Sequence, residues 1–320
     1  MTGQERAASG VHRCAVGVDV GGTKVRAALV DGRGLVGAGL QESTRAAAGV
    51  GVDQAVDLAL RLVDAHGEQT EIVGVGVGLP EVISPGGRVG SAAVVDWRGE
   101  DLPERFAAIG PLVVDADVRC GALAESRLGA GRGASSLLYL SIGTGISASL
   151  VIGGHPWRGA RGSAGLTGSA PLTVLDDAHR LQRCPPLEEV AAGPSIAGRY
   201  AYLSGLRSAS AEEVVSAADR GEALAVEVLT TAGSAVGAHL GLLVAAFDPT
   251  VAVVGGGLGS APGPFWEALR SSVGGHVWAP VTSEVPVSQA TFGGDAGVIG
   301  AGLAALNAYS SGKRTGNAES

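Results

Sequence analysis

The chain is poor in aromatic residues, in cysteine and in positive charge, and each shortage excludes a class of protein. Only 4% of its 320 residues are aromatic, although 46% are hydrophobic, which is enough for two lobes with separate cores. Its three cysteines are widely scattered, which argues against a disulfide framework. With 23 basic against 31 acidic residues, its net charge of −8 argues against a nucleic acid partner, which would require a basic face.

Long apolar runs and targeting signals are also missing. No stretch approaches the roughly 20 uninterrupted apolar residues needed to span a bilayer. The polar start at residues 1–6 lacks the apolar core of a secretion signal. We therefore expect a cytoplasmic protein with no membrane partner. The small, polar and charged residues at 1–11 and 311–320 predict flexible tails.

Glycine is abundant instead, with 53 residues, and the most informative glycines lie in the segment Asp19-Val20-Gly21-Gly22-Thr23-Lys24. Apolar segments at 15–18 and 25–30 flank this motif, so it lies at the turn of a strand meander. Glycine lets backbone N–H groups approach phosphate oxygens closely, and the Thr23 hydroxyl adds another bond. Asp19, at the end of its strand, is placed to hold Mg²⁺ through water. The predicted phosphate-binding residues are Gly21, Gly22, Thr23 and Lys24.

A second hairpin repeats this chemistry at Gly143-Thr144-Gly145, between strand-like segments at 136–142 and 146–152. Two similar hairpins predict two similar lobes that hold one nucleotide. The motif is not a Walker loop, because no Gly-Lys-Ser/Thr follows a glycine-rich run. It is not a dinucleotide fingerprint either, because the glycines lead into a strand rather than a helix.

Asp115-Ala116-Asp117 follows a short buried strand at 112–114 and precedes a helical stretch at 120–128. Ligands of open α/β sheets collect beyond the carboxyl ends of strands, so a carboxylate here is a candidate for catalysis. A helix N-cap is the alternative role for Asp117. Its place in the chain between the two hairpins favours catalysis.

Further segments complete an alternating α/β pattern. Residues 72–79 read as a central strand, and helices are expected at about 187–203, 211–218, 222–246 and 263–272, with a last strand near 285–287. The strand at 251–254 runs into Gly255, Gly256 and Gly257, which leave room for a flat ring. A last helix begins at Asp295 and contains Gly297, Gly300 and Gly302. Each of these glycines costs about 1 kcal/mol in a helix, which suggests close packing.

From about residue 14 to 308 these segments resemble the ROK family, which groups sugar kinases with repressors. The resemblance implies an α/β, two-lobed actin-like ATPase (ribonuclease H-like) fold with an interlobe cleft. It places one lobe at 12–116 plus 293–310 and the other at 117–292. It further implies that ATP binds at Asp19–Lys24, Gly143–Gly145 and the turn at 253–257, and that the protein forms a homodimer.

The segment Asp115–Glu125 resembles the catalytic segment of the family, which usually reads Asn-Asp-Ala-Asn and ends in a similar Leu-Ala-Glu. Alignment on Leu123-Ala124-Glu125 makes Asp117 the catalytic base. Ala116 and Arg119 then replace the usual asparagines, so one contact to a sugar hydroxyl is missing.

The segment Gly159–Ser169 departs further from the family pattern. Leu166 stands where a sugar-binding glutamate is usual, and Ser169 stands where a zinc-binding histidine is usual. Only Cys184 remains of the cysteine-rich loop, whereas structural zinc needs about four N or S ligands, so we expect no zinc. Glu188 matches a second sugar-contact glutamate of the family, and we expect Ala116 and Gly165 to bind the substrate as well.

These replacements indicate an acceptor other than glucose, because buried polar groups select strongly for substrates that pair with them. The expected reaction is ATP-dependent phosphorylation of a primary hydroxyl, best represented by the 6-hydroxyl of a hexose or an amino-hexose such as kanosamine. A C7-cyclitol, phosphorylated at its 7-hydroxyl, is the alternative. Glu81, Asp115 and Glu188 are acids that could face an ammonium group, or could simply be solvated at the surface.

Two other readings remain open. A regulatory protein of the same family would have lost turnover, but the first phosphate motif starts at residue 19 and leaves no room for the DNA-binding module of ROK repressors. An acetate-kinase-like or chaperone-like ATPase would fit the hairpins but not the segment around Asp117.

Overall fold

The computed structural model describes residues 12–44, 50–66, 70–171, 173–175 and 181–316, and its packing forms two compact units. Unit 1 contains the described residues up to Ala124, together with Arg158–Ser163 and the chain from Asp295 onward. Unit 2 contains Glu125–Trp157 and Ala164–Gly294. The short segment Arg158–Ser163 thus packs with unit 1, although both of its chain neighbours belong to unit 2. The lobe boundaries expected from the sequence stay a prediction.

Unit 1 is built on a five-stranded sheet in the order β3-β2-β1-β4-β5. The expected antiparallel meander consists of β1 (His12–Val20), β2 (Lys24–Asp31) and β3 (Gly34–Ser43). β4 (Thr70–Leu79) and β5 (Leu112–Ala116) run parallel to β1, and β4 is buried over most of its length, as its apolar sequence predicts. The carboxyl ends of β1, β4 and β5 therefore meet at one edge of the sheet.

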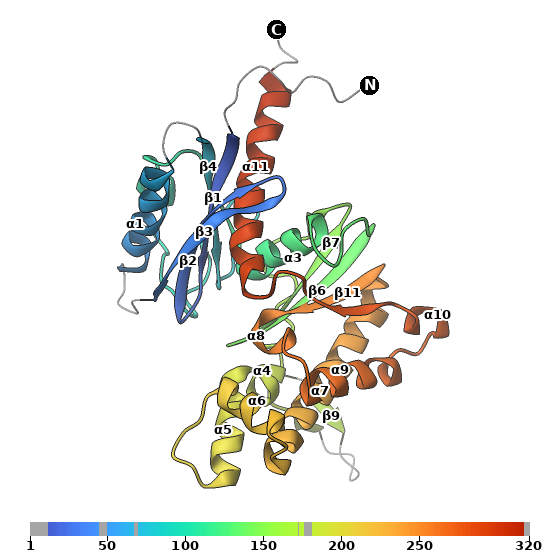
Figure 1. Ribbon diagram of the computed structural model, residues 1–320. Helices are drawn as coiled ribbons and strands as arrows, with labels where there is room; N and C mark the ends of the chain where they lie inside the picture. Colours follow the sequence, from blue (N-terminus) through green and yellow to red (C-terminus); the bar gives the residue numbers. More distant parts are fainter. Residues whose placement is uncertain (1–11, 45–49, 67–69, 172, 176–180, 317–320) are drawn as a thin grey trace. The chain divides into compact units, whose positions relative to one another are not determined.

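Helices cover both faces of this sheet (Figure 1). α1 (Val50–Ala65) lies on one face and α11 (Ala296–Gly316) on the other, while α2 (Leu102–Arg105) and α3 (Asp117–Arg127) flank β5 in the chain. A Cβ at Gly300 of α11 would lie 1.7 Å from the carbonyl oxygen of Cys120, and one at Gly302 would lie 2.5 Å from Cβ of Val30. The close packing predicted from these helix glycines is confirmed.

Unit 2 repeats this topology with a sheet in the order β12-β11-β6-β7-β8. β6 (Ser136–Ile142), β7 (Ile146–Ile152) and β8 (His155–Pro156) form an antiparallel meander, and β11 (Val251–Gly255) and β12 (Val287–Gln289) run parallel to β6. Both units thus consist of a meander followed by two parallel strands beside its first strand. The prediction of two similar lobes is confirmed at the level of topology.

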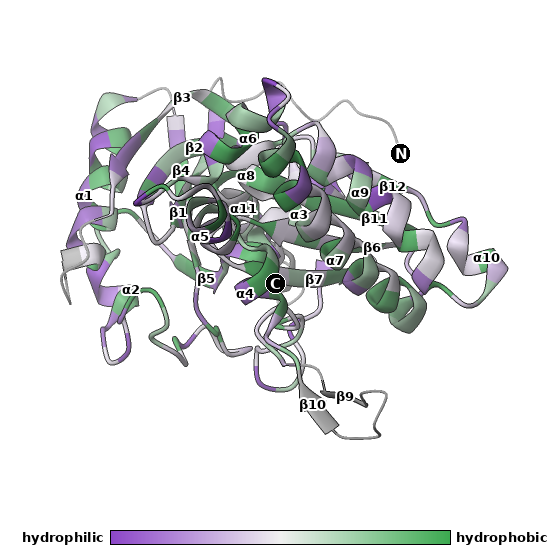
Figure 2. Ribbon diagram, turned by 90° about the horizontal axis from the view of Figure 1, so that it is seen from below, coloured by the Kyte–Doolittle hydropathy of each residue, from purple (hydrophilic) through white to green (hydrophobic). Residues whose placement is uncertain are grey.

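Helices form the rest of unit 2, and α7 (Ala223–Phe247) lies in its hydrophobic core. Hydrophobic colour runs along this helix (Figure 2). By length and composition alone, α7 is the one helix among the described residues that could cross a membrane, and 56% of its most apolar window is buried inside the fold.

The remaining elements are α4 (Leu187–Ala191), α5 (Gly193–Ser204), α6 (Ala211–Asp219), α8 (Gly256–Gly259), α9 (Pro264–Val273), α10 (Pro280–Ser283), a hairpin of β9 (Thr173–Leu175) and β10 (Leu181–Arg183), and two short 3-10 turns at Gly274–His276 and Gly293–Asp295.

Two expected elements differ from the structure. The helix expected at 187–203 is broken at Ala192, which has an extended backbone, because Pro194 in the first turn of α5 favours a new helix start there. The last helix continues to Gly316, beyond the residue at which a tail was expected to begin. The rest of the predicted tails, residues 1–11 and 317–320, lies outside the described residues.

Candidate functional site

The turn between β1 and β2 presents the first predicted phosphate motif. The Gly21 N–H donates to the Lys24 carbonyl over 2.8 Å, and Gly22, Thr23 and Lys24 are exposed. Thr44, at the end of β3, braces the turn: its hydroxyl donates to the Gly21 carbonyl over 2.7 Å, and its N–H donates to the Thr23 carbonyl over 2.9 Å. The role of Thr44 was not predictable from the motif, because Thr44 is 23 residues from Gly21 in the chain and reaches it only when β3 pairs with β2.

Asp19 lies at the carboxyl end of β1, opposite Arg26 on β2. Burial raises the pKa of its carboxyl group to about 7, and the charge of Asp117 adds to the shift, while Arg26 opposes it. The carboxylate packs against α11, because a Cβ at Gly297 would lie 2.6 Å from Cγ of Asp19. A carboxyl group with so high a pKa gains a proton or a cation readily near neutral pH.

Asp117 is the first residue of α3, directly after β5. Its Oδ1 accepts a hydrogen bond from the N–H of the next residue, Val118, over 2.6 Å. Burial raises its pKa to about 6, although the Val118 N–H and Arg119 oppose this and Glu81 adds to it. A pKa of this size suits a general base near neutral pH.

The fold brings Asp19 and Asp117 to the same edge of the unit 1 sheet. Gly78, near the end of β4, separates them: a Cβ there would lie 3.5 Å from Oδ1 of Asp19 and 3.5 Å from Cα of Asp117. β4 lies between β1 and β5, so the two carboxylates stand on either side of a strand that has no side chain at this point. Their mutual repulsion is one cause of the raised pKa of Asp19.

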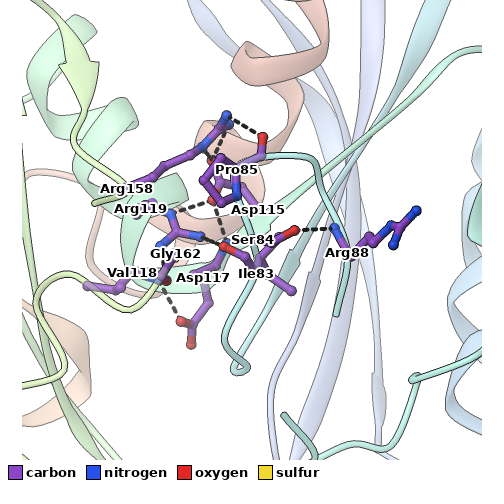
Figure 3. Close-up of polar contacts among 11 residues, drawn as sticks. Ile83, Ser84, Pro85, Arg88, Asp115, Asp117, Val118, Arg119, Arg158 and Gly162 are labelled. Carbon is purple, nitrogen blue, oxygen red and sulfur yellow. Dashed lines mark hydrogen bonds and ion pairs between the residues drawn. The ribbon is translucent and has the colours of Figure 1, made fainter. Parts of the chain in front are cut away.

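Asp115 is bound by two arginines (Figure 3). Its Oδ1 accepts from Nε of Arg119 and from the Ala116 N–H, and its Oδ2 accepts from Nε of Arg158 over 3.1 Å and from Nη2 over 2.7 Å. A carboxylate offers about four acceptor positions, and all four are used. In this structure Asp115 is therefore not available to a substrate ammonium group. One feature of the sequence indicated this role: Asp115 and Arg119 are four residues apart near the start of a helix, a spacing that allows an ion pair.

Glu81 is saturated in the same way. Its carboxylate accepts from the Ser91 hydroxyl and from the backbone N–H groups of residues 93–95, the latter over 2.6–2.8 Å. Burial works to raise its pKa, but these hydrogen bonds outweigh burial and lower it. Glu81 thus organises the loop that follows β4 and has no acceptor position left for an ammonium group.

In unit 2, the hairpin between β6 and β7 carries the second motif. Thr144 and Gly145 are exposed, while the Gly143 carbonyl accepts from the Gly193 N–H at the start of α5 over 2.8 Å. Glu188 backs this turn: its Oε1 accepts from the Ile146 N–H over 2.7 Å. Its Oε2 accepts from the Ser169 hydroxyl over 2.7 Å, so the residue in the usual zinc-ligand position binds a carboxylate instead.

Most of the other glycines of unit 2 that were predicted to line the site lie where a neighbouring group comes too close for a side chain. At the end of β11, a Cβ at Gly256 would lie 2.3 Å from the Ile142 carbonyl oxygen, whereas Gly257 faces open space and Gly255 lies over the Tyr139 ring. Gly165 has φ +89° and would place a Cβ 1.9 Å from the Ala148 carbonyl oxygen. These contacts explain why glycine occupies positions 165, 255 and 256.

The predicted site residues therefore fall into two groups. Unit 1 holds Asp19, the turn at 21–24, Glu81, Asp115, Ala116 and Asp117, and unit 2 holds Gly143–Gly145, Gly165, Glu188 and Gly255–Gly257. Within the part of the chain that the structure describes, no cluster of three His, Cys, Asp or Glu side chains could hold a metal ion. Mg²⁺ still fits unit 1, because it keeps several waters and needs few carboxylates, and a cation would offset the repulsion between the carboxylates of Asp19 and Asp117. Zinc would require ligands that Ser169 and Leu166 do not offer.

Comparison with known proteins agrees with the fold. A glucokinase from Halalkalibacterium halodurans is 29% identical over 315 residues, covering 90% of this chain and 93% of the relative. An N-acetylgalactosamine kinase from Shewanella is 29% identical over 302 residues, covering 90% and 95%. The crystal structure of a ROK family glucokinase from Streptomyces griseus, in complex with glucose and AMPPNP, superposes with a TM-score of 0.75 at 26% identity, covering 92% and 99%. Because the family model for ROK matches residues 15–308, nearly the whole chain, this protein belongs to the ROK family.

Proposed function

We propose that this protein, an ATP-dependent carbohydrate kinase, transfers the γ-phosphoryl group of ATP to a primary hydroxyl of a sugar or sugar-like polyol. The observation that carries the proposal is the placement of Asp117 and Asp19 at one edge of the unit 1 sheet. Asp117 has a pKa of about 6 and sits where ligands of open α/β sheets collect. The best candidate acceptor is the 6-hydroxyl of a hexose or of an amino-hexose such as kanosamine.

In this mechanism Asp117 accepts the proton of the acceptor hydroxyl. The hydroxyl oxygen forms a bond to the γ-phosphorus as the bond from that phosphorus to the β–γ bridging oxygen breaks, and ADP leaves with the electron pair. Phosphoryl transfer needs little covalent chemistry from the protein, so positioning and electrostatic stabilisation supply most of the rate. The protonated Asp117 then returns its proton to water.

The hairpins would hold ATP, and Asp19 would hold Mg²⁺ through water. Gly22, Thr23, Thr144 and Gly145 are exposed, and backbone N–H groups of such glycine-rich turns are suited to phosphate oxygens. Gly257 at the start of α8, which faces open space, leaves room for the flat adenine ring. The ion would neutralise charge on the phosphates, and the pKa of Asp19, about 7, falls once a cation shares its site.

One observation favours the C7-cyclitol as a second candidate acceptor. An amino-hexose kinase would gain specificity from an acid that faces the ammonium group, but the carboxylates of Glu81 and Asp115 are saturated by protein donors. Glu188 accepts two hydrogen bonds and retains acceptor positions. Leu166, 39% exposed in place of a family glutamate, offers an apolar contact rather than a hydrogen bond to the hydroxyl at an anomeric centre.

ADP release, measured with Mg-ATP and a panel of acceptors, tests the proposal. The panel contains glucose, mannose, glucosamine, N-acetylated hexosamines, kanosamine and C7-cyclitols. Turnover of one acceptor should fall by about 10²–10⁴-fold in Asp117→Asn, the range expected on losing a general base. Asp64→Asn, on the exposed side of α1, is the matched control and should keep normal turnover.

Three outcomes separate the alternatives. Turnover of a cyclitol but no hexose would assign the second candidate acceptor. Normal turnover in Asp117→Asn would contradict the assignment of Asp117 as the general base. If the protein binds ATP but releases no ADP with any acceptor of the panel, a regulatory role is favoured.

A further inference from the structure

The guanidinium group of Arg119 is buried and holds three separate segments together. Arg119 lies on α3, two residues after Asp117, and is only 2% exposed. Its Nε donates to Asp115, its Nη1 donates to the Gly162 carbonyl over 2.8 Å, and its Nη2 donates to the Ile83 carbonyl over 2.8 Å. Figure 3 shows all three contacts converging on this one side chain.

The two carbonyl groups belong to segments that touch each other at this point. Gly162 has φ +84°, and a Cβ there would lie 1.9 Å from the Ile83 carbonyl oxygen. The segment Arg158–Ser163, which we call the strap, therefore packs its backbone directly on the loop after β4. Arg158, at the other end of the strap, binds Asp115 and so attaches the strap to the same turn a second time.

The contacts are of a kind that resists rearrangement. Asp115 is 6% exposed and lies between two guanidinium groups, and its four acceptor positions are filled. Removing one partner of such a buried pair leaves a charge without compensation, which is costly. Planar guanidinium groups also impose a fixed geometry on their acceptors, unlike an ammonium group. The turn at 115–119 is thereby held in one position relative to the strap and the loop.

We propose that Arg119 is a positioning residue for the phosphoryl transfer, which holds Asp117 in place by locking its turn to the strap and to the loop after β4. The inference rests on the proposed function, because it assigns Asp117 as the base. The proposal is based on the ion pair between Arg119 and Asp115. Asp117 lies between these two residues in the chain, so the ion pair fixes the backbone on both sides of it. A displacement of about 1 Å in a reacting group costs on the order of 10²-fold in rate, so such fixation matters to turnover.

The test compares Arg119→Lys with Arg88→Lys in the full-length protein. Lysine keeps the positive charge but cannot reach three acceptors in fork geometry. Arg88 lies on the same loop, is exposed, and points away from the cluster (Figure 3), so the same substitution there is a matched control. For each variant we would measure kcat, the KM of the acceptor, the binding of an ATP analogue and the melting temperature.

We expect kcat of Arg119→Lys to fall at least tenfold, with binding of the ATP analogue within twofold of wild type and a melting temperature within a few degrees. Arg88→Lys should match the wild type. A kcat within twofold of wild type in Arg119→Lys would overturn the proposal. A loss of kcat matched by loss of ATP binding and a large fall in melting temperature would also overturn it, because the role would then be only structural.

If Arg119→Lys fails to fold, Asp115→Asn provides a second break of the same ion pair, in which asparagine keeps the size of the side chain and one acceptor oxygen. Its kcat should fall about fivefold or more while the protein remains folded and binds the ATP analogue, and an unchanged kcat would overturn the inference. These results are distinguishable from failure of the proposed function. That failure would appear in the wild type as an absence of acceptor turnover, or in Asp117→Asn as normal turnover.

Discussion

The carboxylate of Asp19 packs directly against the backbone of Gly297, at the start of α11. A Cβ at residue 297 would lie 2.6 Å from Oδ2 and 2.7 Å from Oδ1 of Asp19, closer than any Cβ approaches a heavy atom. The first turn of the last helix thus forms one wall around a carboxylate near the start of the chain. This contact depends on glycine at position 297.

Gly297→Ala should therefore displace Asp19. Although alanine favours a helix by about 1 kcal/mol, the added methyl group overlaps the carboxylate, which has to move. We expect kcat to fall by at least tenfold and the Mg²⁺ concentration required for half-maximal activity to rise, as a steady-state titration with Mg²⁺ would measure.

Gly198→Ala is the control for this change. Gly198 lies within α5, and a Cβ there meets no heavy atom within 4 Å. This substitution should stabilise the protein slightly and leave activity unchanged. Equal kinetics for both variants and the wild type would contradict a tight Asp19 site.

The pKa of Asp117 predicts how stability depends on pH. In the folded protein it is raised from 3.8 to about 6, so the fold favours the protonated carboxyl group and loses stability as pH rises through this window. Asp117→Asn, which is always neutral, should therefore unfold at a higher temperature than the wild type at pH 8. The difference should disappear at pH 4. Because the side chain is partly exposed, we expect a gain of about 1 kcal/mol or less. A variant less stable than wild type at pH 8 would contradict a raised pKa.

Glu188 supports the second hairpin from behind. Its carboxylate accepts a hydrogen bond from the N–H of Ile146, a residue that is only 1% exposed. Glu188→Ala should leave this N–H unpaired and cost about 1–3 kcal/mol of unfolding free energy, with a raised KM for ATP because the turn at 143–145 loosens. Glu188→Gln keeps an acceptor oxygen and should cost far less. Glu189→Ala, at the exposed neighbouring position, is the control, and chemical denaturation with ATP kinetics measures all three. Equal losses in the alanine and glutamine variants would contradict the acceptor role.

The three thiols should differ sharply in reactivity. Cys14 and Cys120 are buried, and burial raises the pKa of Cys14 to about 11 and that of Cys120 well above its ordinary value. The thiolate is the reactive species, so both should resist a thiol reagent in the native protein. Cys184 is partly exposed and should react first. Titration with an aromatic disulfide should give one fast thiol in native buffer and three in denaturant, and fast labelling of Cys120 would contradict the packing of α3 against α11.

Part of the fold and site is readable from local sequence. The meander around 19–24, the repeated hairpin at 143–145 and the strand before Asp117 are contiguous patterns, and each appears in the structure where it was expected. The glycines of α11 likewise predicted close packing. Helix breaks were harder to predict, because the interruption at Ala192 depends on one proline and on the contact of Gly193 with Gly143.

The roles of the acidic residues were not readable. Glu81 and Asp115 resemble substrate ligands in sequence, but their hydrogen-bond donors lie 10 to 14 residues away for Glu81 and as far as 43 residues away for Asp115. The sequence marked Arg119 only as a departure from the family pattern. Its carbonyl partners at Ile83 and Gly162 are 36 and 43 residues distant, and nothing in their side chains signals the contact.

By itself, the sequence determined the family, the duplicated α/β topology and the positions of the two glycine-rich hairpins and of Asp117. These features rest on short patterns, since backbone conformation, turn chemistry and strand periodicity act over a few residues. Only the tertiary structure decided which carboxylates remain open to a ligand and which are held by the protein. A carboxylate becomes saturated through donors that folding brings from distant segments, and that convergence follows from the packing of strands, loops and helices in three dimensions.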